Sequence, residues 1–462
     1  MKFKLIVASM GALGLISCPA FATQTKHHHH HHKAKHVAHR DYKDMGPIPA
    51  PVEVCTISTS SLIMDKTTQN EGRALPNPCN PGWFNRIALS GGVNVDLGKW
   101  GNRNANYMGE NYKRISLNDV YLNLSATVND WSKAFVSIDY ATPTTNPNPA
   151  IFNNRGAAEY DAAYANNIGG SGANLIQVEQ AYATFGNFDV SPIYVQVGKQ
   201  FADFSRYDIH PVTVSLTQAI SEVLATQLKV GFIANGFHGS LYGFDDPTAK
   251  IGSSSTPTNY GVSLGYDQIC DNFGWGIGAA YLYNLIGVND TAYSVNNFTG
   301  GNGYHSRVGG YAVYGDLNYG PFTLGATFTA AAQRFNVNDL TKNGYADLVP
   351  ISLTSALIGS GFQVTPGANA TGAKPWAAGI QAGYNFNVWC KDQNVYLGYQ
   401  ASREAAGLNL PRGRWEAGYG IAMWKNTDFG LVWDHDQAYS RSNGGNSKTT
   451  NLVSIRAGVK FA

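Results

Sequence analysis

The chain has 462 residues, of which 14% are charged and 12% aromatic, with 51 glycines and a formal net charge of +2. Soluble domains carry about 25% charged residues, and nucleic-acid-binding chains carry a clustered basic excess, so this composition fits neither class well. No apolar run beyond the N-terminus approaches the roughly 20 residues of a membrane helix. Many Gly and aromatic residues without long apolar runs favour a membrane β-barrel, in which alternate residues face lipid. The alternative is a large soluble all-β protein.

Residues 1–22 are predicted to be an export signal. Lys2 and Lys4 form its charged start, residues 5–16 form a short apolar core, and Ala20 and Ala22 give a small-x-small cleavage pattern. The competing interpretation is lipoprotein processing at Cys18, because residues 15–18 resemble a lipobox.

Residues 23–82 are predicted to form a periplasmic lead-in, rich first in His and then in Pro, Ser and Thr. Its histidines fit either an affinity tag or a natural tract that binds Zn, Cu or Ni. They are His27, His28, His29, His30, His31, His32, His36 and His39. The segment is too short for the plug domain of an energised receptor.

The lead-in also contains Cys55 and Cys79, which can form a disulfide in an oxidising compartment. Cys270 and Cys390 fall in two short predicted turns, four strands apart. Because Cα atoms more than about 7 Å apart do not form a disulfide, the connectivity of these four cysteines stays open.

From residue 83 to residue 462 the pattern predicts a transmembrane barrel of about 16 antiparallel strands. The segments of alternating polarity are connected in turn by short turns and longer loops, seven and eight in number. A soluble sandwich has no reason to separate short turns from long loops in this way. The expected strands are residues 87–97, 119–128, 133–140, 175–185, 193–200, 226–233, 237–244, 259–266, 274–286, 306–317, 322–331, 375–386, 394–402, 412–423, 428–435 and 449–461. Asn235 and Gly236 give a strong hairpin signal. The short turns are expected in the periplasm and the long loops outside the cell.

The last predicted strand places Val453, Ile455 and Val459 on one face and Ser454 and Arg456 on the other. One face suits lipid and the other suits water. A terminal strand with an aromatic residue next to its end is how outer-membrane barrels close onto their first strand, and it is the segment that the barrel-assembly machinery is expected to bind.

No cofactor site and no catalytic arrangement is predicted. The glycines in residues 274–278 read as a strand, because no helix follows them as nucleotide binding requires. Asp434, His435 and Asp436 are adjacent on a strand, so their side chains alternate between its two faces. The chain is therefore predicted not to be an enzyme.

Residues 201–225 form the third long loop, which in sixteen-stranded porins commonly folds into the barrel. Phe201, Phe204 and Leu216 are expected to pack on the inner wall. The candidate constriction and substrate contacts are Lys199, Asp203, Arg206, Asp208, His210 and Glu222, since charges crowded at a constriction select solutes. The alternative is a surface loop with solvated charges.

One region resembles a known family. The similarity is carried by Val195, Gln196, Val197, Gly198, Lys199, Gln200 and Phe201, then Phe204, Tyr207, Pro211, Ser215, Leu216, Thr217, Gln218 and Glu222. These residues resemble the LbtU family of siderophore porins, typified by the receptor for legiobactin, and more distantly phosphate-selective porins. The resemblance extends over most of the chain from residue 83, but the His-rich lead-in matches none of its motifs.

That resemblance implies a Gram-negative outer-membrane barrel that imports a ferric siderophore without a plug domain or TonB-type coupling. The residues themselves support a channel with a polar lumen. Two alternatives remain, a general or anion-selective porin for small nutrients and a structural surface barrel that transports nothing. Expected partners are outer-membrane lipid and a small solute; a homotrimer is open, and nucleic acid is not expected.

Overall fold

A computed structural model describes residues 87–100, 112–129, 131–141, 175–188, 190–205, 215–253, 258–270, 273–299, 301–347, 366–424 and 426–461. Its strands are β1 (Ile87–Trp100), β2 (Tyr112–Asn129), β3 (Ser132–Ala141), β4 (Leu175–Phe185), β5 (Ile193–Phe201), β6 (Leu224–Ala234), β7 (Phe237–Asp245), β8 (Thr258–Cys270), β9 (Phe273–Leu282), β10 (Gly310–Tyr319), β11 (Phe322–Ala331), β12 (Trp376–Val388), β13 (Lys391–Arg403), β14 (Gly413–Trp424), β15 (Thr427–Gln437) and β16 (Thr449–Phe461). The helices are α4 (Leu216–Ala219) and α5 (Asn289–Thr299), with 3-10 turns η3 (Leu285–Gly287), η4 (Gly344–Asp347), η5 (Ala406–Leu408) and η6 (Arg441–Asn443).

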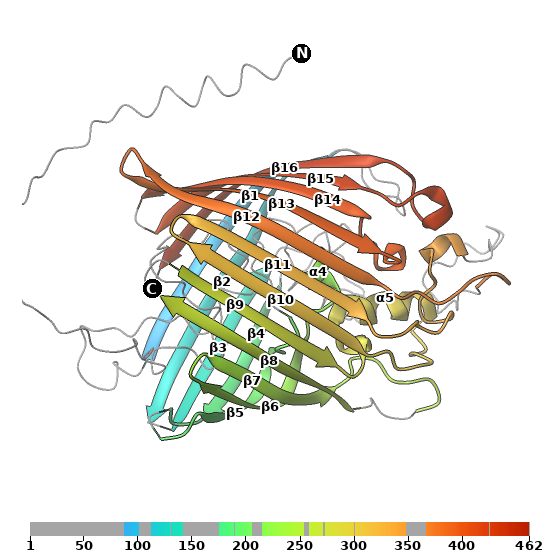
Figure 1. Ribbon diagram of the computed structural model, residues 1–462, viewed down its shortest axis with the longest axis horizontal. Coiled ribbons are helices and arrows are strands. Elements are labelled where there is room, and N and C mark those ends of the chain that lie inside the picture. The colour runs from blue at the N-terminus through green and yellow to red at the C-terminus, as the bar shows by residue number, and fades with distance from the viewer. Residues whose placement is uncertain are drawn as a thin grey trace, which may run out of the picture.

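The strands form one closed barrel in which each pairs with its neighbours in sequence and β16 pairs with β1 (Figure 1). Every neighbouring pair is antiparallel, as the sequence predicts. The predicted fold is confirmed, including the separation of short turns from long loops. The Asn235–Gly236 turn has positive φ at both residues, 50° and 86°, as a two-residue hairpin of type I′ requires.

Several strand boundaries differ from the prediction, among them the start of β2 at Tyr112 instead of residue 119 and the end of β8 at Cys270 instead of residue 266. Strand β9 ends at Leu282 instead of residue 286, because the side chain of Asn284 caps the 3-10 turn η3 by accepting from the amide of Ile286. Strand β10 begins at Gly310 instead of residue 306, after a segment that packs inside the barrel. The apolar residues in both stretches are buried in a turn and in a loop. The alternation of apolar and polar residues in the sequence does not by itself distinguish such a turn or loop from a strand.

The outer face of the barrel is apolar. On β16, Val453 and Val459 are exposed while Ser454 and Arg456 are buried, and the other strands alternate in the same way. Each of the seven short turns carries an exposed aromatic residue in or beside it: Trp131, Phe185, Phe237, Phe273, Phe322, Trp389 and Trp424. A second set of exposed aromatics lies nearer the long loops: Tyr260, Tyr281, Tyr311, Trp415 and Trp433. An apolar band between two aromatic girdles identifies a membrane-spanning barrel of the outer-membrane type.

Among the described residues, no helix is long and apolar enough to cross a membrane.

The barrel closes between β1 and β16 through a buried ion pair. Asp96 lies opposite Arg456 in the register, and Arg456 Nε and Nη2 donate to the two Asp96 carboxylate oxygens over 2.7 and 2.8 Å. A bidentate Arg–carboxylate pair of this kind fixes the orientation of the two side chains as well as the distance between them.

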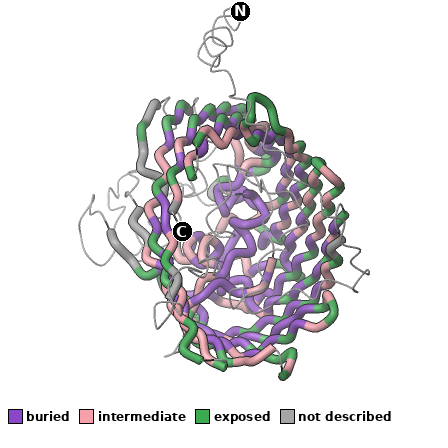
Figure 2. The backbone as a smooth tube through the Cα atoms, turned by 90° about the vertical axis from the view of Figure 1, so that its left-hand side faces the viewer, coloured by how far each residue is buried: buried purple, intermediate pink, exposed green. Residues whose placement is uncertain are grey.

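The long loops fold back into the barrel and build an apolar core there. Figure 2 looks into the barrel from the short-turn end and shows buried segments inside the ring of strands. This core joins loop residues such as Phe204, Leu216, Phe298 and Leu340 to small inward-facing strand residues such as Ala377. Its strand residues come from β7, β9, β10, β11 and β12. The interior is therefore filled with apolar side chains along one side.

Candidate functional site

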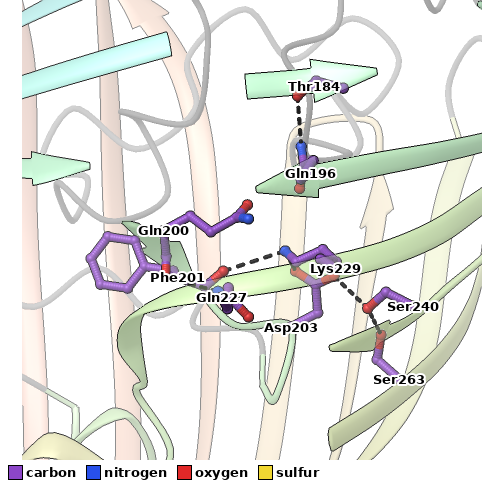
Figure 3. A network of polar contacts seen from close by, with 9 residues as sticks. All are labelled: Thr184, Gln196, Gln200, Phe201, Asp203, Gln227, Lys229, Ser240 and Ser263. Atoms are coloured by element: carbon purple, nitrogen blue, oxygen red, sulfur yellow. Dashed lines mark hydrogen bonds and ion pairs between the residues drawn. The ribbon is translucent and has the colours of Figure 1, made fainter. Parts of the chain in front are cut away.

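The loop between β5 and β6 begins at an anchor on its own side of the barrel. Lys229 on β6 is fully buried, and its Nζ donates to Asp203 Oδ1 over 2.7 Å and to the Phe201 carbonyl over 3.3 Å. Ser240 on β7 donates to the other Asp203 oxygen over 2.6 Å and lies 2.9 Å from Ser263 on β8 (Figure 3). The carboxylate of Asp203 thus ties the start of the loop to two neighbouring strands, and the ion pair offsets the cost of burying Lys229.

Further along, the loop forms the short helix α4 inside the barrel. Ser215 is its N-cap, and the hydroxyl accepts from the Gln218 amide over 3.1 Å, as expected for a Ser that precedes a helix. All four helical residues are buried. Gln218 also donates to Glu222 over 2.6 Å, which holds the chain leaving the helix.

The helix is fixed to the far wall of the barrel. The Leu216 amide donates to Gln400 Oε1 on β13 over 2.6 Å, and Gln400 Nε2 donates to Glu416 Oε2 on β14 over 2.8 Å. Because β5 and β6 lie seven and more strands from β13 in the barrel order, the loop crosses the lumen. Its near end is anchored by Asp203 and its far end by Gln400.

The predicted site residues have different places. Asp203 and Glu222 belong to the crossing loop, where Asp203 is ion-paired and Glu222 is buried, 3% exposed. Lys199 shares the outer-facing side of β5 with Val197, and its Nζ donates to the Val178 carbonyl over 2.8 Å, so it is not beside Asp203. Arg206, Asp208 and His210 lie outside the described residues. A role of these six in solute selection stays a prediction.

Carboxamide side chains line the inner wall of β4 to β6. Gln180, Gln196, Gln200 and Gln227 are all buried, and each has at least one amide atom without a hydrogen-bond partner in the described part of the chain. A register shift between β3 and β4 leaves Glu179 as an extra residue, so that Glu179 and Gln180 are both buried. Bulges re-aim side chains in this way. This wall is polar but largely uncharged.

The opposite wall, from β14 through β16 to β1, is charged. The inward-facing described side chains include three cations, each ion-paired: Arg414 with Asp436 at 2.7 Å, Arg456 with Asp96 at 2.7 Å, and Lys460 with Asp428 at 3.6 Å. Two more carboxylates, Glu416 and Asp434, lie in the same wall. From the sequence, Asp434 and Asp436 were considered only as catalytic residues, and Arg456 only as part of the polar face of the last strand. The alternation of these charged residues with apolar residues along β14, β15 and β16 is the sequence signal that could have predicted a charged inner wall.

The long loops are tied to each other by buried polar groups at the end of the barrel. Asp246 accepts from Asn259, Asn284 and Tyr304 over 2.7, 2.8 and 3.1 Å. Burial raises the pKa of Asp246, against the effect of these hydrogen bonds, and burial beside Asp246 raises the pKa of Tyr304 to about 12. Between loops, the His305 and Ser306 amides both donate to Asp339.

The remaining predicted groups fall largely outside the description. The histidines of residues 27–39, together with Cys55 and Cys79, lie among undescribed residues, so metal binding and their disulfide stay predictions. Cys390 is disulfide-bonded; side chains of the other cysteines are outside the described set. No group of three or more His, Cys, Asp or Glu side chains among the described residues is placed to hold a metal ion.

No protein-family model matches the chain. A UPF0422 protein of Coxiella burnetii is 24% identical over 390 residues, which cover 82% of this chain and 70% of the relative. A UPF0422 protein of Legionella pneumophila strain Lens is 24% identical over 375 residues, 75% of this chain, and the match spans 62% of the relative's length.

Among solved structures, the outer membrane channel DcaP of Acinetobacter baumannii aligns with a TM-score of 0.49 at 12% identity, over 81% of this chain and 97% of that one. An anion-selective porin from Comamonas acidovorans aligns with the same TM-score at 9% identity, over 81% of this chain and 99% of that one.

Proposed function

We propose that the chain is an outer-membrane channel for small hydrophilic solutes whose lumen is narrowed by the loop between β5 and β6. The observation that carries this proposal is the pair of anchors, Asp203 on Lys229 and Leu216 on Gln400, which hold the loop across the barrel. A barrel with a polar inner wall and an inward-folded loop has the parts of a selective pore, a path and a constriction. A barrel serving only as a surface scaffold has no need of such a crossing.

The finer proposal is uptake of a ferric siderophore without a plug domain or TonB-type coupling. It is supported by the resemblance of residues 195–222, which include Asp203 of the near anchor and the helix α4. Its test is growth of a deletion strain on purified ferric siderophore as the iron source, with complementation by the intact gene. Growth equal to that of the parent strain would remove siderophore uptake and leave the channel proposal standing.

The alternative within the same class is a general diffusion porin. A liposome-swelling assay with a series of neutral sugars tests it: swelling that falls smoothly with sugar size supports general diffusion. An anion-selective pore is disfavoured by the charge of the wall formed by β14, β15, β16 and β1, whose described inward-facing groups are five carboxylates and three cations. Barrels that produce no swelling and no conductance would contradict the channel proposal itself.

The proposal includes an orientation, with the short turns and the lead-in of residues 23–82 in the periplasm and the long loops outside. Three further predictions accompany this proposal. They are that the protein forms a homotrimer, that the barrel-assembly machinery recognises β16, and that the protein has no enzymatic activity.

A further inference from the structure

Four glutamine side chains lie close together on the inner wall of β4, β5 and β6. Ala181 pairs with Lys199, which makes Gln180 on β4 and Gln200 on β5 the next residues beyond that pair. On β6, the partner of Gly198 is a glutamine, and Gly198 lies two positions before Gln200. We call the four side chains the carboxamide cluster; they are Gln180, Gln196, Gln200 and Gln227, and they are 0%, 0%, 0% and 3% exposed.

Two of these side chains make no hydrogen bond within the described ranges. In both Gln180 and Gln200, the amide nitrogen and the amide oxygen are buried and have no partner there. Turning either amide over exchanges its nitrogen and oxygen, but it creates no hydrogen bond, because both atoms lack a partner. Figure 3 shows the side chain of Gln200 pointing away from the ring of Phe201, with no dashed line at its amide. Buried polar side chains almost always have a partner, so these two amides indicate a bound species that is not part of the chain.

The other two side chains are held so that only their amide oxygens are free. Gln196 Nε2 donates to Thr184 Oγ1 over 3.2 Å, and Gln227 Nε2 donates to the Gln200 carbonyl over 2.9 Å. The Oε1 atoms of Gln196 and Gln227 are buried, and no described group donates to them. Because an amide oxygen only accepts, a ligand has to donate to these two atoms, whereas the amide of Gln180 or Gln200 can either donate to the ligand or accept from it.

The charged groups beside the carboxamide cluster are already bonded to the chain. Lys229, which pairs with Gln196 in the register, is ion-paired with Asp203 at 2.7 Å. Glu179, on the bulge of β4, accepts from the Ser137 hydroxyl over 3.3 Å. Among the described residues, β4 and β5 contribute none to the apolar core. An uncharged ligand that both donates and accepts hydrogen bonds therefore fits this wall better than an ion or an apolar group does.

We propose that the carboxamide cluster binds the hydroxyl groups of an uncharged polyol, such as a sugar, as the solute passes the crossing loop. A hydroxyl group donates to a fixed amide oxygen and accepts from a free amide N–H, so it matches both kinds of side chain in the cluster. The site lies at the near anchor of the crossing loop, since Lys229 pairs with Gln196 and holds Asp203. This inference rests on the proposed channel function and names a class of solute for it. It holds whether or not a ferric siderophore is also carried.

The test is the single-channel ion conductance of the full-length protein in planar bilayers at increasing concentrations of glucose. In the wild type a bound sugar obstructs the pore, so the conductance is expected to fall and to reach a plateau. Triethylene glycol dimethyl ether has nearly the same mass as glucose but only accepts hydrogen bonds, and it is expected to lower the conductance without a plateau. Gln200→Met removes the amide without removing a described hydrogen bond of that side chain. It is expected to raise the half-saturating glucose concentration by about three- to tenfold, the effect of losing one hydrogen bond to the ligand.

The matched control is Gln393→Met, which replaces a buried glutamine whose amide is fully bonded. Gln393 Nε2 donates to the Val388 carbonyl over 2.9 Å, and its Oε1 accepts from the Tyr419 hydroxyl over 2.7 Å. This variant is expected to leave the half-saturating glucose concentration unchanged.

A conductance that falls equally with glucose and with the ether, without a plateau, would mean that the carboxamide cluster holds water only. That result would overturn this inference but not the channel. A plateau at a glucose concentration that Gln200→Met leaves unchanged, or that it shifts no more than Gln393→Met does, would overturn the inference as well. An absence of conductance would instead count against the proposed function.

Discussion

The two sides of the barrel interior are built on different principles. Along β7 to β12, small inward-facing residues such as Ala312 and Ala377 make room for apolar loop residues, and the space becomes a protein core. From β13 through β16 to β5, the inner wall carries carboxylates, arginines and carboxamides, with aromatics such as Phe135 and Tyr182 between them. The crossing loop contributes to both, since Phe204 and Leu216 join the core while Asp203 and Gln400 fix its ends. Burial of apolar area stabilises the first side, which leaves the second side for solutes.

The largest expected effect is on conductance. Deleting residues 203–210 removes Asp203 and Phe204, and with them the near anchor of the crossing loop. Single-channel conductance is expected to rise by about twofold or more, as it does when a constriction is widened. Unchanged conductance in planar bilayers would place the loop outside the solute path and would remove the distinction between the two sides.

The apolar side is tested by Phe298→Ala in α5. Phe298 is 1% exposed in the apolar core, so its truncation is expected to lower the free energy of unfolding by about 3–5 kcal/mol. Urea unfolding in detergent micelles measures this loss. Phe322→Ala is the control, because Phe322 is 57% exposed on the outer face, and it should lose much less. Equal losses would show that the loops do not form a packed core.

The near anchor is tested by Lys229→Met. The substitution leaves Asp203, whose side chain is 22% exposed, without its ion pair. A destabilisation of about 2 kcal/mol is expected, below the range for fully buried pairs because water still reaches the carboxylate. The double variant with Asp203→Asn should recover part of this loss. A double variant no better than Lys229→Met would mean that the two side chains are not coupled.

The smallest effect concerns a tie between two outer loops. Burial opposes ionisation of Glu404, but hydrogen bonds from Arg334 and the Lys374 amide outweigh it and lower the pKa of Glu404 below its usual 4.5. Because the pKa is lowered, the stabilisation from this ion pair is fully present at pH values above the usual pKa of Glu404. It is lost as the pH falls through the lowered pKa of the folded protein. Because Arg334 is half exposed, the loss is about 0.5 kcal/mol.

Hydrogen exchange at the Lys374 amide reports this change. Protection should fall on acidification in wild type and should be low at every pH in Glu404→Ala. Protection that is independent of pH in wild type would contradict the assignment.

The strands were predictable because lipid and water impose a period of two on them. In β2, Leu122 and Leu124 are exposed to lipid and Tyr121 and Asn123 are buried, as the alternation indicates. The ends of β9 and β10 were not predictable, because Leu285, Ile286 and Val308 are buried by a 3-10 turn and by loops. Residues buried inside the lumen do not recur at a fixed spacing along the sequence. The same apolar residues are therefore compatible with a strand or with a folded loop.

The site was predictable in part. The position of the loop in the strand order indicated that residues 201–225 would be the third long loop, and its apolar residues Phe204 and Leu216 indicated packing. Its far anchor was not predictable, since Gln400 lies 184 residues from Leu216. The opposition of Glu416 and Asp434 depends on the register between β14 and β15, which the turn between them fixes and which the sequence does not state.

The ion pair between Asp96 and Arg456 joins residues 360 positions apart, across the one strand pair that is not made of sequence neighbours. A slip of one residue along this junction would place Asp96 opposite Ile455 or Ala457, and it would turn one of the two charged groups toward lipid. The cost of a charge in hydrocarbon is several kcal/mol, so a barrel closed in a shifted register would be less stable by about that amount. The pair therefore favours the observed alignment of the first and last strands over the two alignments that differ from it by one residue.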